Sequence, residues 1–406
     1  MAEFDYDVAI IGSGFGGSVS ALRLTEKGYK VLVIEAGRRF EDADFPKTSW
    51  RTKQFLFAPA LGCYGIQRIH LLPDAVILAG AGVGGGSLVY ANTLYVPPEP
   101  FFKDKQWGHI TDWQSELAPY YDQAKRMLGV VQNPTMTPSD VELKAVADEM
   151  GVGDTFTLTP VGVYFGEGGG VTAQDPYFGG RGPARTGCIE CGECMTGCRH
   201  NAKNTLVKNY LYLAESAGAE ISPMTTVTGL EQHGEGYAID TKRTGSRKGK
   251  RRIYAKEVIV AAGAYNTQRL LHSMKDSGRL PNLSPALGRL SRSNSEALLG
   301  AITDDRSRDY TRGVAITSSF YPEPHTHIEP VRYGKGSNMM GFLQTVMTDE
   351  IDGEPRWKTW IRELVRQRSN ALQMIDLRGW SERSIIRRVM QSVDNSLTVS
   401  GKRSRF

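Results

Sequence analysis

Residues 6–34 alternate between apolar runs and glycine-containing breaks. Two short apolar runs flank a segment with helical spacing, and glycines at 12–17 and at Gly28 separate the three pieces. The runs are apolar throughout, so we expect parallel strands that are buried on both faces. In the helix we expect Val19, Leu22 and Leu24 to face inward. The three predicted elements are strand 6–11, helix 18–27 and strand 31–34.

Beyond this unit the chain mixes helical and strand-like periodicity, without internal repeats. In one predicted helix, Trp357, Trp360, Ile361 and Leu364 form an apolar stripe, which we expect to lie in the core. Predicted helices cover 112–130, 139–150, 204–217, 357–368 and 381–391. Short strands are expected over 225–259 with a basic hairpin tip at 244–249, a last apolar strand over 258–262, and β-like segments within 301–341.

Composition adds limits on size and location. The 406 residues, 40% of them hydrophobic, exceed one ordinary domain, so we expect two interleaved lobes. No apolar run approaches the about 20 residues of a membrane span, and no basic segment precedes 4–11 as in a signal peptide. We therefore expect a cytoplasmic protein that starts at Met1.

Charge gives a weaker indication of partners. The net charge is +5, which gives no indication of a nucleic-acid partner. Lys and Arg outnumber Asp and Glu over 356–406. A solvated helix face is the commoner explanation, and peripheral contact with a membrane surface or an acidic partner is the alternative.

The break between the first strand and helix has the form G-x-G-x-x-G. Gly12 allows a tight turn, Gly14 lets backbone approach a pyrophosphate, and Gly17 lets the helix pack on the sheet. The helix N-terminus supplies free N–H groups to the anion. Glu35 ends the second strand, where its carboxylate can accept hydrogen bonds from ribose hydroxyls and repel a 2′-phosphate. The context predicts a dinucleotide site.

Three features favour FAD over NAD. The motif lies at the very start of the chain, and a second glycine-rich loop covers 80–87. The strand 258–262, ending at Gly263, resembles the returning strand of flavoproteins with two dinucleotide sites. Beside the motif and Glu35, the expected cofactor contacts are Phe15, Gly16, Gly80, Gly84, Gly85, Gly86, Ser87, Asn92, Val227, Ala262 and Gly263.

Three segments together resemble the glucose-methanol-choline (GMC) oxidoreductases, and within them the cholesterol oxidase-like branch. They are GSGFGG at 12–17, GAGVGGGSLVYAN at 80–92 and AAGAYNTQRLLHS at 261–273. The last is similar to the family's second signature, with Thr267, Leu270 and Leu271 matching and Gln268 standing where proline is usual. The resemblance extends from the N-terminus to at least Gly341.

The resemblance implies an α/β fold of the FAD/NAD(P)-binding Rossmann type with two dinucleotide-binding signatures and an interleaved α+β substrate domain. Residues 1–97 and 216–300 would bind FAD, and 98–215 and 301–406 would form the substrate region. It also implies oxidation of a CH–OH group, of a sterol or similar apolar alcohol, by hydride transfer to the flavin. The electron acceptor would be O₂ or a redox partner.

Two departures from the family pattern affect this expectation. The asparagine that usually contacts the flavin follows a serine by three or four positions, and here Asn92 is shifted. The family's closing segment, of Asp-Gly-Ser…Pro…Gly-x-Asn-Pro type and preceded by a catalytic histidine, is not found before Phe406. We therefore expect a truncated or a divergent substrate domain, and a non-catalytic chain is one alternative.

Four cysteines form Cys188-x2-Cys191-x2-Cys194-x3-Cys198, the spacing of a bacterial ferredoxin loop. Arg199 follows, where such loops have proline. A 4Fe-4S cluster, structural zinc, a redox-active thiol set and buried thiols all stay open. With iron, the protein would be an iron–sulfur flavoprotein dehydrogenase, as for sugar acids, that passes electrons to a protein or quinone. Isolated Cys63 is expected in the core.

The segment HTHIEP supplies the candidate catalytic residues. His325, His327 and Glu329 are two apart, so in an extended strand all three point to one face. Glu329 beside His327 at a substrate cavity would act as the base. The alternative, which is the commoner arrangement, is a polar strand edge.

Overall fold

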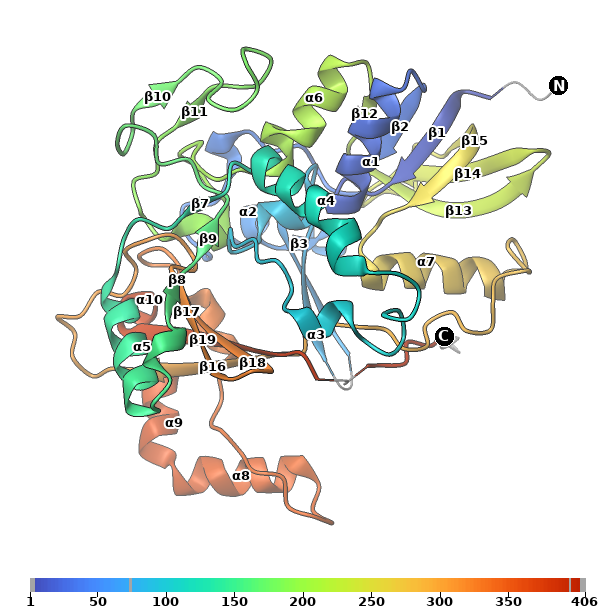
Figure 1. Ribbon diagram of the computed structural model, residues 1–406. Helices are drawn as coiled ribbons and strands as arrows, with labels where there is room; N and C mark the ends of the chain where they lie inside the picture. Colours follow the sequence, from blue (N-terminus) through green and yellow to red (C-terminus); the bar gives the residue numbers. More distant parts are fainter. Residues whose placement is uncertain (1–3, 73–74, 394–395, 402–406) are drawn as a thin grey trace.

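The computed structural model describes residues 4–72, 75–393 and 396–401 (Figure 1). One sheet with its helices occupies the top of Figure 1, and a second sheet lies below it. The helices are α1 (Phe15–Glu26), α2 (Thr52–Phe55), α3 (Glu99–Phe102), α4 (Trp113–Met127), α5 (Pro138–Glu149), α6 (Tyr210–Ser216), α7 (Ala264–Asp276), α8 (Arg356–Arg366), α9 (Arg368–Ile375) and α10 (Trp380–Arg383).

The upper sheet has six strands in the order β12-β2-β1-β15-β14-β13. Strand β1 lies between β2 and β15 and is parallel to both, so its backbone is paired on each side. Strands β13 and β14 continue the sheet as antiparallel neighbours of β15. The strands are β1 (Tyr6–Ile11), β2 (Val31–Ile34), β12 (Glu220–Ser222), β13 (Thr225–His233), β14 (Gly236–Arg243) and β15 (Arg251–Val260).

Side chains of β1 alternate between two buried layers. Val8 and Ile10 pack against α1 and α6 on one face, whereas Ala9 and Ile11 pack toward Met274 of α7 on the other. An apolar run with no polar face is what a strand covered on both sides requires. The predicted bounds of β1 and β2, and their parallel pairing, are confirmed.

The inward face predicted for α1 is partly wrong. Leu22 is buried as expected, but Val19 is 36% exposed. The helix begins at Phe15, and its buried residues are Gly17, Ser18, Ala21 and Leu22. The contact face therefore consists of two pairs, Gly17 with Ala21 and Ser18 with Leu22, whose members are four residues apart. A glycine and a serine on that face let the helix come close to the sheet, and an apolar-only pattern misses them.

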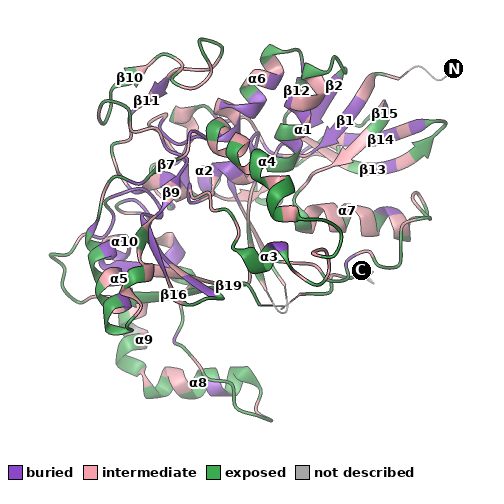
Figure 2. Cartoon of the chain, in the orientation of Figure 1, coloured by how far each residue is buried: buried purple, intermediate pink, exposed green. Residues whose placement is uncertain are grey.

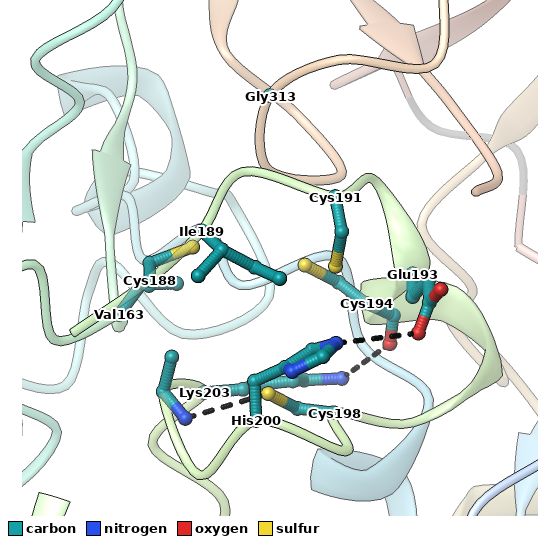
Figure 3. A pocket seen from close by; sticks show the side chains of 11 residues that line it. Val163, Cys188, Ile189, Cys191, Glu193, Cys194, Cys198, His200, Lys203 and Gly313 are labelled. Carbon is teal, nitrogen blue, oxygen red and sulfur yellow. Dashed lines mark hydrogen bonds and ion pairs between the residues drawn. The ribbon is translucent and has the colours of Figure 1, made fainter. Parts of the chain in front are cut away.

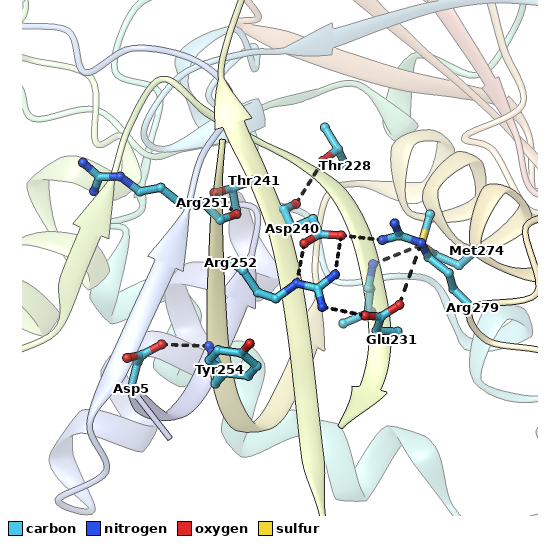
Figure 4. Close-up of polar contacts among 11 residues, drawn as sticks. Asp5, Thr228, Glu231, Asp240, Thr241, Arg251, Arg252, Tyr254, Met274 and Arg279 are labelled. Carbon is cyan, nitrogen blue, oxygen red and sulfur yellow. Dashed lines mark hydrogen bonds and ion pairs between the residues drawn. The ribbon is translucent and has the colours of Figure 1, made fainter. Parts of the chain in front are cut away.

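An ion-pair network ties the antiparallel strands to the segment after α7 (Figure 4). Arg252 on β15 contacts Asp240 on β14 at 2.8 and 3.1 Å, and Glu231 on β13 at 3.0 Å. Arg279 donates to Asp240 across 2.6 Å. These two guanidinium groups lower the pKa of the Asp240 carboxyl.

The lower sheet has five strands in the order β16-β19-β18-β17-β8. Its central strand β18 pairs with β17 on one side and β19 on the other, both antiparallel. The predicted polar strand edge at His327 and Glu329 is therefore wrong, because both edges of β18 are occupied. The strands are β8 (Thr157–Leu158), β16 (Glu296–Ile302), β17 (Ser318–Glu323), β18 (Thr326–Val331) and β19 (Ser384–Gln391).

The helix predicted over 381–391 is also wrong. Only the short α10 is helical there, and the chain then forms strand β19 between β16 and β18. Ile385, Ile386 and Val389 are β-branched and favour the strand. Pairing on both sides satisfies the backbone of β19, and a pattern within one segment does not reveal such partners. Strand and helix are hard to separate in short apolar runs.

The remaining strands form small antiparallel pairs. They are β3 (Phe57–Ala58) with β4 (Cys63–Tyr64), β5 (Gln67–Leu71) with β6 (Val76–Gly80), β7 (Val131–Gln132) with β9 (Pro160–Val161), and β10 (Thr172–Ala173) with β11 (Arg185–Thr186). Cys63 lies in such a pair and is only half-buried, so its predicted core position is wrong. The predicted helix 204–217 is a 3-10 turn, Leu206–Lys208, followed by α6.

Helix α8 extends below the body of the molecule and is mostly exposed (Figures 1 and 2). Trp357, Trp360 and Ile361 are 58%, 40% and 46% exposed, so the expected core position of this stripe is wrong. The periodicity identified the apolar face of the helix, but it carries no information on what covers that face. No helix in the described ranges is both long and apolar enough to cross a membrane.

Candidate functional site

The first glycine loop connects β1 to α1. At Gly12 and Gly17 neighbouring backbone atoms come so close that no side chain would fit. Gly12 has φ +105°, and a Cβ there would lie 2.4 Å from the carbonyl oxygen of Ala261. A Cβ on Gly17 would lie 2.0 Å from the carbonyl oxygen of Gly12. At Gly14, by contrast, no atom lies within 4 Å of the Cβ position. The loop thus packs tightly on its inner side and leaves free space at Gly14, where the pyrophosphate was predicted.

The N-terminus of α1 faces this free space without a capping side chain. Gly14 is the N-cap and provides no side-chain hydrogen bond to the first turn. Phe15 and Gly16 begin the helix, and the Cβ position of Gly16 is also open. The unsatisfied N–H groups of a first turn, with the helix dipole, suit an anion such as a pyrophosphate.

Glu35 ties the first loop to the second. Its buried carboxylate accepts hydrogen bonds from the Ser13 hydroxyl at 2.7 Å and the Gly37 amide at 2.8 Å. The Ser13 hydroxyl in turn accepts one from the Gly84 amide at 3.1 Å. These contacts hold the carboxylate at the end of β2. Its predicted contact with a ribose stays a prediction.

The second glycine loop lies directly on the first. A Cβ on Gly85 would lie 2.7 Å from Gly14 Cα, and one on Gly80 would lie 2.2 Å from the carbonyl oxygen of Gly85. Gly86 faces more open space, with the Phe15 ring 3.8 Å from its Cβ position. The Ser87 hydroxyl is buried, donating to Gly84 O at 2.7 Å and accepting from Leu206 N at 3.0 Å. Ser87 therefore fixes the loop.

Asn92, which follows this loop, carries an unusual combination of features. It is fully buried, has φ +72°, and its amide has the Cys194 thiol as a hydrogen-bonding neighbour. A left-handed conformation in a residue other than glycine is strained and often occurs at functional positions. An amide that offers both a donor and an acceptor beside the glycine loops fits the edge of a flavin ring.

The other predicted cofactor residues reach the same edge of the sheet. Strand β13 starts beside Glu35, whose carbonyl accepts from the Thr225 amide at 2.8 Å, and half-buried Val227 follows two residues later. Ala262 and Gly263 follow Ala261, the residue after β15, whose carbonyl oxygen lies close to Gly12. All of them therefore gather at the carboxyl end of the parallel strands, where dinucleotides bind in such sheets.

The predicted catalytic pair is buried in the lower sheet. Glu329 is 0% exposed, and the Tyr95 hydroxyl is a hydrogen-bonding neighbour of its carboxylate. His327 Nδ1 lies 4.0 Å from one oxygen, and Arg388 Nη1 lies 3.7 Å from the other. Burial raises the pKa of Glu329 to about 7, against the opposing effect of Arg388. His325, in contrast, is exposed and outside the strand.

His327 is held as a neutral ring between aromatic side chains. It stacks on Tyr321 with ring centroids 4.5 Å apart, and the edge of Tyr95 lies at 4.9 Å. Burial, with a smaller effect of Arg388, lowers its pKa to about 4. The pair therefore combines a carboxyl group that titrates near neutral pH with an imidazole that stays uncharged.

Tyr95 connects this pair to the cofactor loops. It follows Asn92 by three residues, a stretch that spans at most about 11 Å, and its hydroxyl donates to Ser319 Oγ at 3.1 Å. Asn92 begins the segment 92–95, and Tyr95 at its other end lies beside Glu329 and His327. Sequence patterns predicted Glu329, His327 and Asn92 but gave no signal for Tyr95, Tyr321 or Arg388, which come from separate strands or loops.

The four predicted cysteines line one cavity, together with Glu193, His200 and Lys203 (Figure 3). All four are free thiols. Burial raises the pKa of the Cys188 and Cys194 thiols, and that of Cys191 to about 12. Burial also raises the pKa of Glu193, whose carboxylate lies 3.7 Å from His200 Nε2. The spacing thus predicted a real gathering of the four side chains.

The parallel sheet and its glycine loops define a dinucleotide-binding protein of the Rossmann type, with a second loop suited to a flavin. In agreement, the profile of the NAD(P)-binding Rossmann-like domain matches residues 10–40, and that of the GMC oxidoreductases matches residues 184–289.

The two profile matches cover only parts of the chain, whereas similar proteins match nearly all of it. A cholesterol oxidase of Mycobacterium tuberculosis is 61% identical over 99% of this chain and 72% of its own length. One of Acinetobacter baumannii is 42% identical over 100% of this chain and 75% of its own. The chain belongs to the GMC oxidoreductases, which are FAD-dependent alcohol oxidoreductases.

A solved structure supports the fold. The pyridoxine 4-oxidase from Mesorbium loti matches 97% of this chain and 73% of its own, with a TM-score of 0.51. The sequence identity is 13%, so this likeness concerns the fold alone.

Proposed function

We propose that this protein oxidises the hydroxyl group of a sterol to a carbonyl, with FAD as the hydride acceptor and O₂ as the final electron acceptor. The relatives described above as cholesterol oxidases support the substrate class. The observation that carries the chemistry is the fully buried carboxylate of Glu329, which lies beside His327 and Arg388.

The residues that would hold FAD fit that cofactor. Gly12, Gly14 and Gly17 with Glu35 would hold its ADP half, and Gly84 to Ser87 with Asn92 would face its ring. The open position at Gly14 and the buried, left-handed Asn92 beside the second glycine loop are the observations that support this fit. FAD, when bound, supplies the acceptor for the hydride that leaves the carbinol carbon.

Glu329 would act as the base for the substrate hydroxyl. As the carbinol carbon loses a hydride, the hydroxyl oxygen must lose its proton, and a carboxylate with a pKa near 7 is well matched to accept it. Neutral His327 would hydrogen-bond the same oxygen, its ring fixed by Tyr321 and Tyr95. The substrate loses two electrons and two protons in all, and O₂ takes up both to give hydrogen peroxide.

We also propose the domain division that this function requires. Residues 1–97 and 216–300 would form the FAD-binding part, and 98–215 and 301–406 the substrate part. The upper sheet supports it, because its strands come from 6–34 and 220–260. Four of the five strands of the lower sheet lie in the substrate part, and β16 (Glu296–Ile302) crosses the proposed boundary at 300.

The test uses the FAD-loaded full chain, cholesterol in detergent, and peroxide formation under air. Glu329→Gln keeps the shape and removes the base, so turnover should fall by about 10²–10⁴-fold while FAD stays bound. His325→Gln is the matched control, because His325 precedes the same strand but is exposed; it should turn over like the parent protein. Undiminished peroxide formation by the Glu329→Gln variant would refute the assigned base.

A further inference from the structure

The cysteine-rich loop is shaped so that four thiols face one space. It runs from β11 toward the 3-10 turn Leu206–Lys208, and Figure 3 shows Cys188, Cys191, Cys194 and Cys198 around a common cavity. Left-handed residues turn the backbone between the thiols. Gly192 has φ +72°, and a Cβ there would lie 2.1 Å from the carbonyl oxygen of Thr311, so this turn requires glycine.

The separation of the sulfur atoms argues against a single metal ion held by the cysteines. One zinc ion binds thiolates at about 2.3 Å, which places its sulfur ligands about 4 Å apart. In the described part of the chain, one group of three or more such ligands has its atoms within 4.8 Å of one another, and it consists of Cys191, Glu193 and His200. No three of the four sulfurs meet that limit. In a 4Fe-4S cluster each of the four thiolates binds its own iron atom, so this cluster type accepts the wider spacing.

The surroundings of the sulfurs suit an anionic cluster. The Glu190 amide donates to Cys188 Sγ at 3.3 Å, and the Ala202 amide donates to Cys198 Sγ at 3.4 Å. Such N–H···S bonds stabilise cluster thiolates and tune their potential. Both donors are backbone groups, so the loop geometry itself supplies them.

Lys203 provides the second independent observation. Its side chain is 2% exposed, and Nζ donates to Cys194 O at 2.9 Å and to Leu88 O at 3.1 Å, with the Tyr90 ring at 4.7 Å. Its contacts among the described residues are thus carbonyl oxygens and a ring, without a carboxylate. A buried ammonium normally has an anionic partner, and a cluster at the cysteines would provide one.

We propose that Cys188, Cys191, Cys194 and Cys198 bind an iron–sulfur cluster of the 4Fe-4S type, as a second cofactor next to the FAD site. The proximity follows from Lys203, which donates to the carbonyl of Cys194 and to that of Leu88, the residue directly after the second glycine loop. The inference goes beyond sterol oxidation, because neither the family nor its proposed chemistry needs a cluster.

The test is metal and sulfide analysis of the full chain, purified without oxygen and then reconstituted with ferrous iron and sulfide. The proposal predicts about four iron and four sulfide per chain, a brown absorbance that dithionite bleaches, and an electron paramagnetic resonance signal in the reduced sample. Zinc without sulfide, or a protein with neither metal after reconstitution, would overturn it. These readouts do not involve sterol turnover, so they are independent of the proposed function.

Two variants test the ligands. Cys191→Ser should lose the iron and the sulfide, whereas Cys63→Ser, which changes the fifth cysteine outside the loop, should keep both. Circular dichroism and FAD content show whether each variant is folded. If Cys191→Ser is unstable, Lys203→Met offers a second measurement: removing a buried positive charge should lower the reduction potential of the cluster. A full cluster in the Cys191→Ser variant, or an unchanged potential in Lys203→Met, would contradict the assigned site.

Discussion

Among single residues, Glu329 matters most for activity and for stability. Its burial in the core favours the protonated carboxyl group, whereas its proposed role as a base requires the ionised one. Arg388 at 3.7 Å offsets part of the cost of ionisation. The two-residue spacing in the sequence predicted Glu329 and His327 as a pair, and their catalytic role stays a prediction. The sequence could not predict Arg388, Tyr95 or Tyr321, because these side chains meet the pair only through strand pairing and a loop crossing.

The pH dependence of flavin reduction follows from the pKa of Glu329, which is about 7. The rate should rise about tenfold per pH unit at acid pH and level off above about pH 7. His327, with a pKa of about 4, stays neutral over this range and adds no second limb. Anaerobic stopped-flow mixing with sterol between pH 5 and 9 measures the profile. A flat profile would mean that Glu329 is not the base.

The same group should affect stability in a pH-dependent way. Its folded-state pKa is raised from 4.5 to about 7, so it contributes stability that is present below pH 4.5 and lost as the pH rises to about 7. Glu329→Gln should therefore stabilise the protein at pH 8 by about 3 kcal/mol, at 1.36 kcal/mol per pKa unit. The gain should be much smaller near pH 5. Thermal unfolding at both pH values tests this, and an equal effect at both would be inconsistent with a buried titrating carboxyl.

Among the helices and strands, those set by a local sequence pattern were predictable. Those that depend on pairing with distant parts of the chain were not. Strands β1 and β2 have the predicted bounds, because an apolar run between glycine breaks has few alternatives. Strand β19 was predicted as a helix, because what makes it a strand is its pairing with β16 and β18, far away in sequence. The apolar stripe of α8 was likewise predicted as a helix face, but the sequence pattern did not reveal that this face is exposed.

Substitutions of Gly14 and of Gly17 in the first loop should have different effects. Gly14→Val adds atoms in open space on the side where the pyrophosphate is expected, so the protein should fold normally and lose FAD. Gly17→Ala places a methyl group 2.0 Å from a backbone oxygen, so it should lower the unfolding free energy by about 1–3 kcal/mol. Flavin content and denaturant unfolding separate the two effects. FAD retention by Gly14→Val would refute the assigned loop.

At the scale of the whole molecule, two sheets bring together residues that are distant along the chain. The carboxyl end of the parallel sheet gathers the two glycine loops, and the short segment from Asn92 to Tyr95 connects them to the buried acid on β18. The sequence was sufficient to predict the first of these groups, because its motifs are local. The relation between cofactor loops and Glu329 depends on how the two sheets pack, which no local motif encodes.

The most direct test of the account is a single-turnover experiment without oxygen. FAD-loaded protein is mixed with cholesterol, and the flavin absorbance and the sterol ketone are measured together. The account predicts that the flavin band bleaches, that one ketone forms per reduced flavin, and that Glu329→Gln slows both equally. A flavin that stays oxidised in the presence of sterol, or ketone formation without flavin reduction, would contradict it.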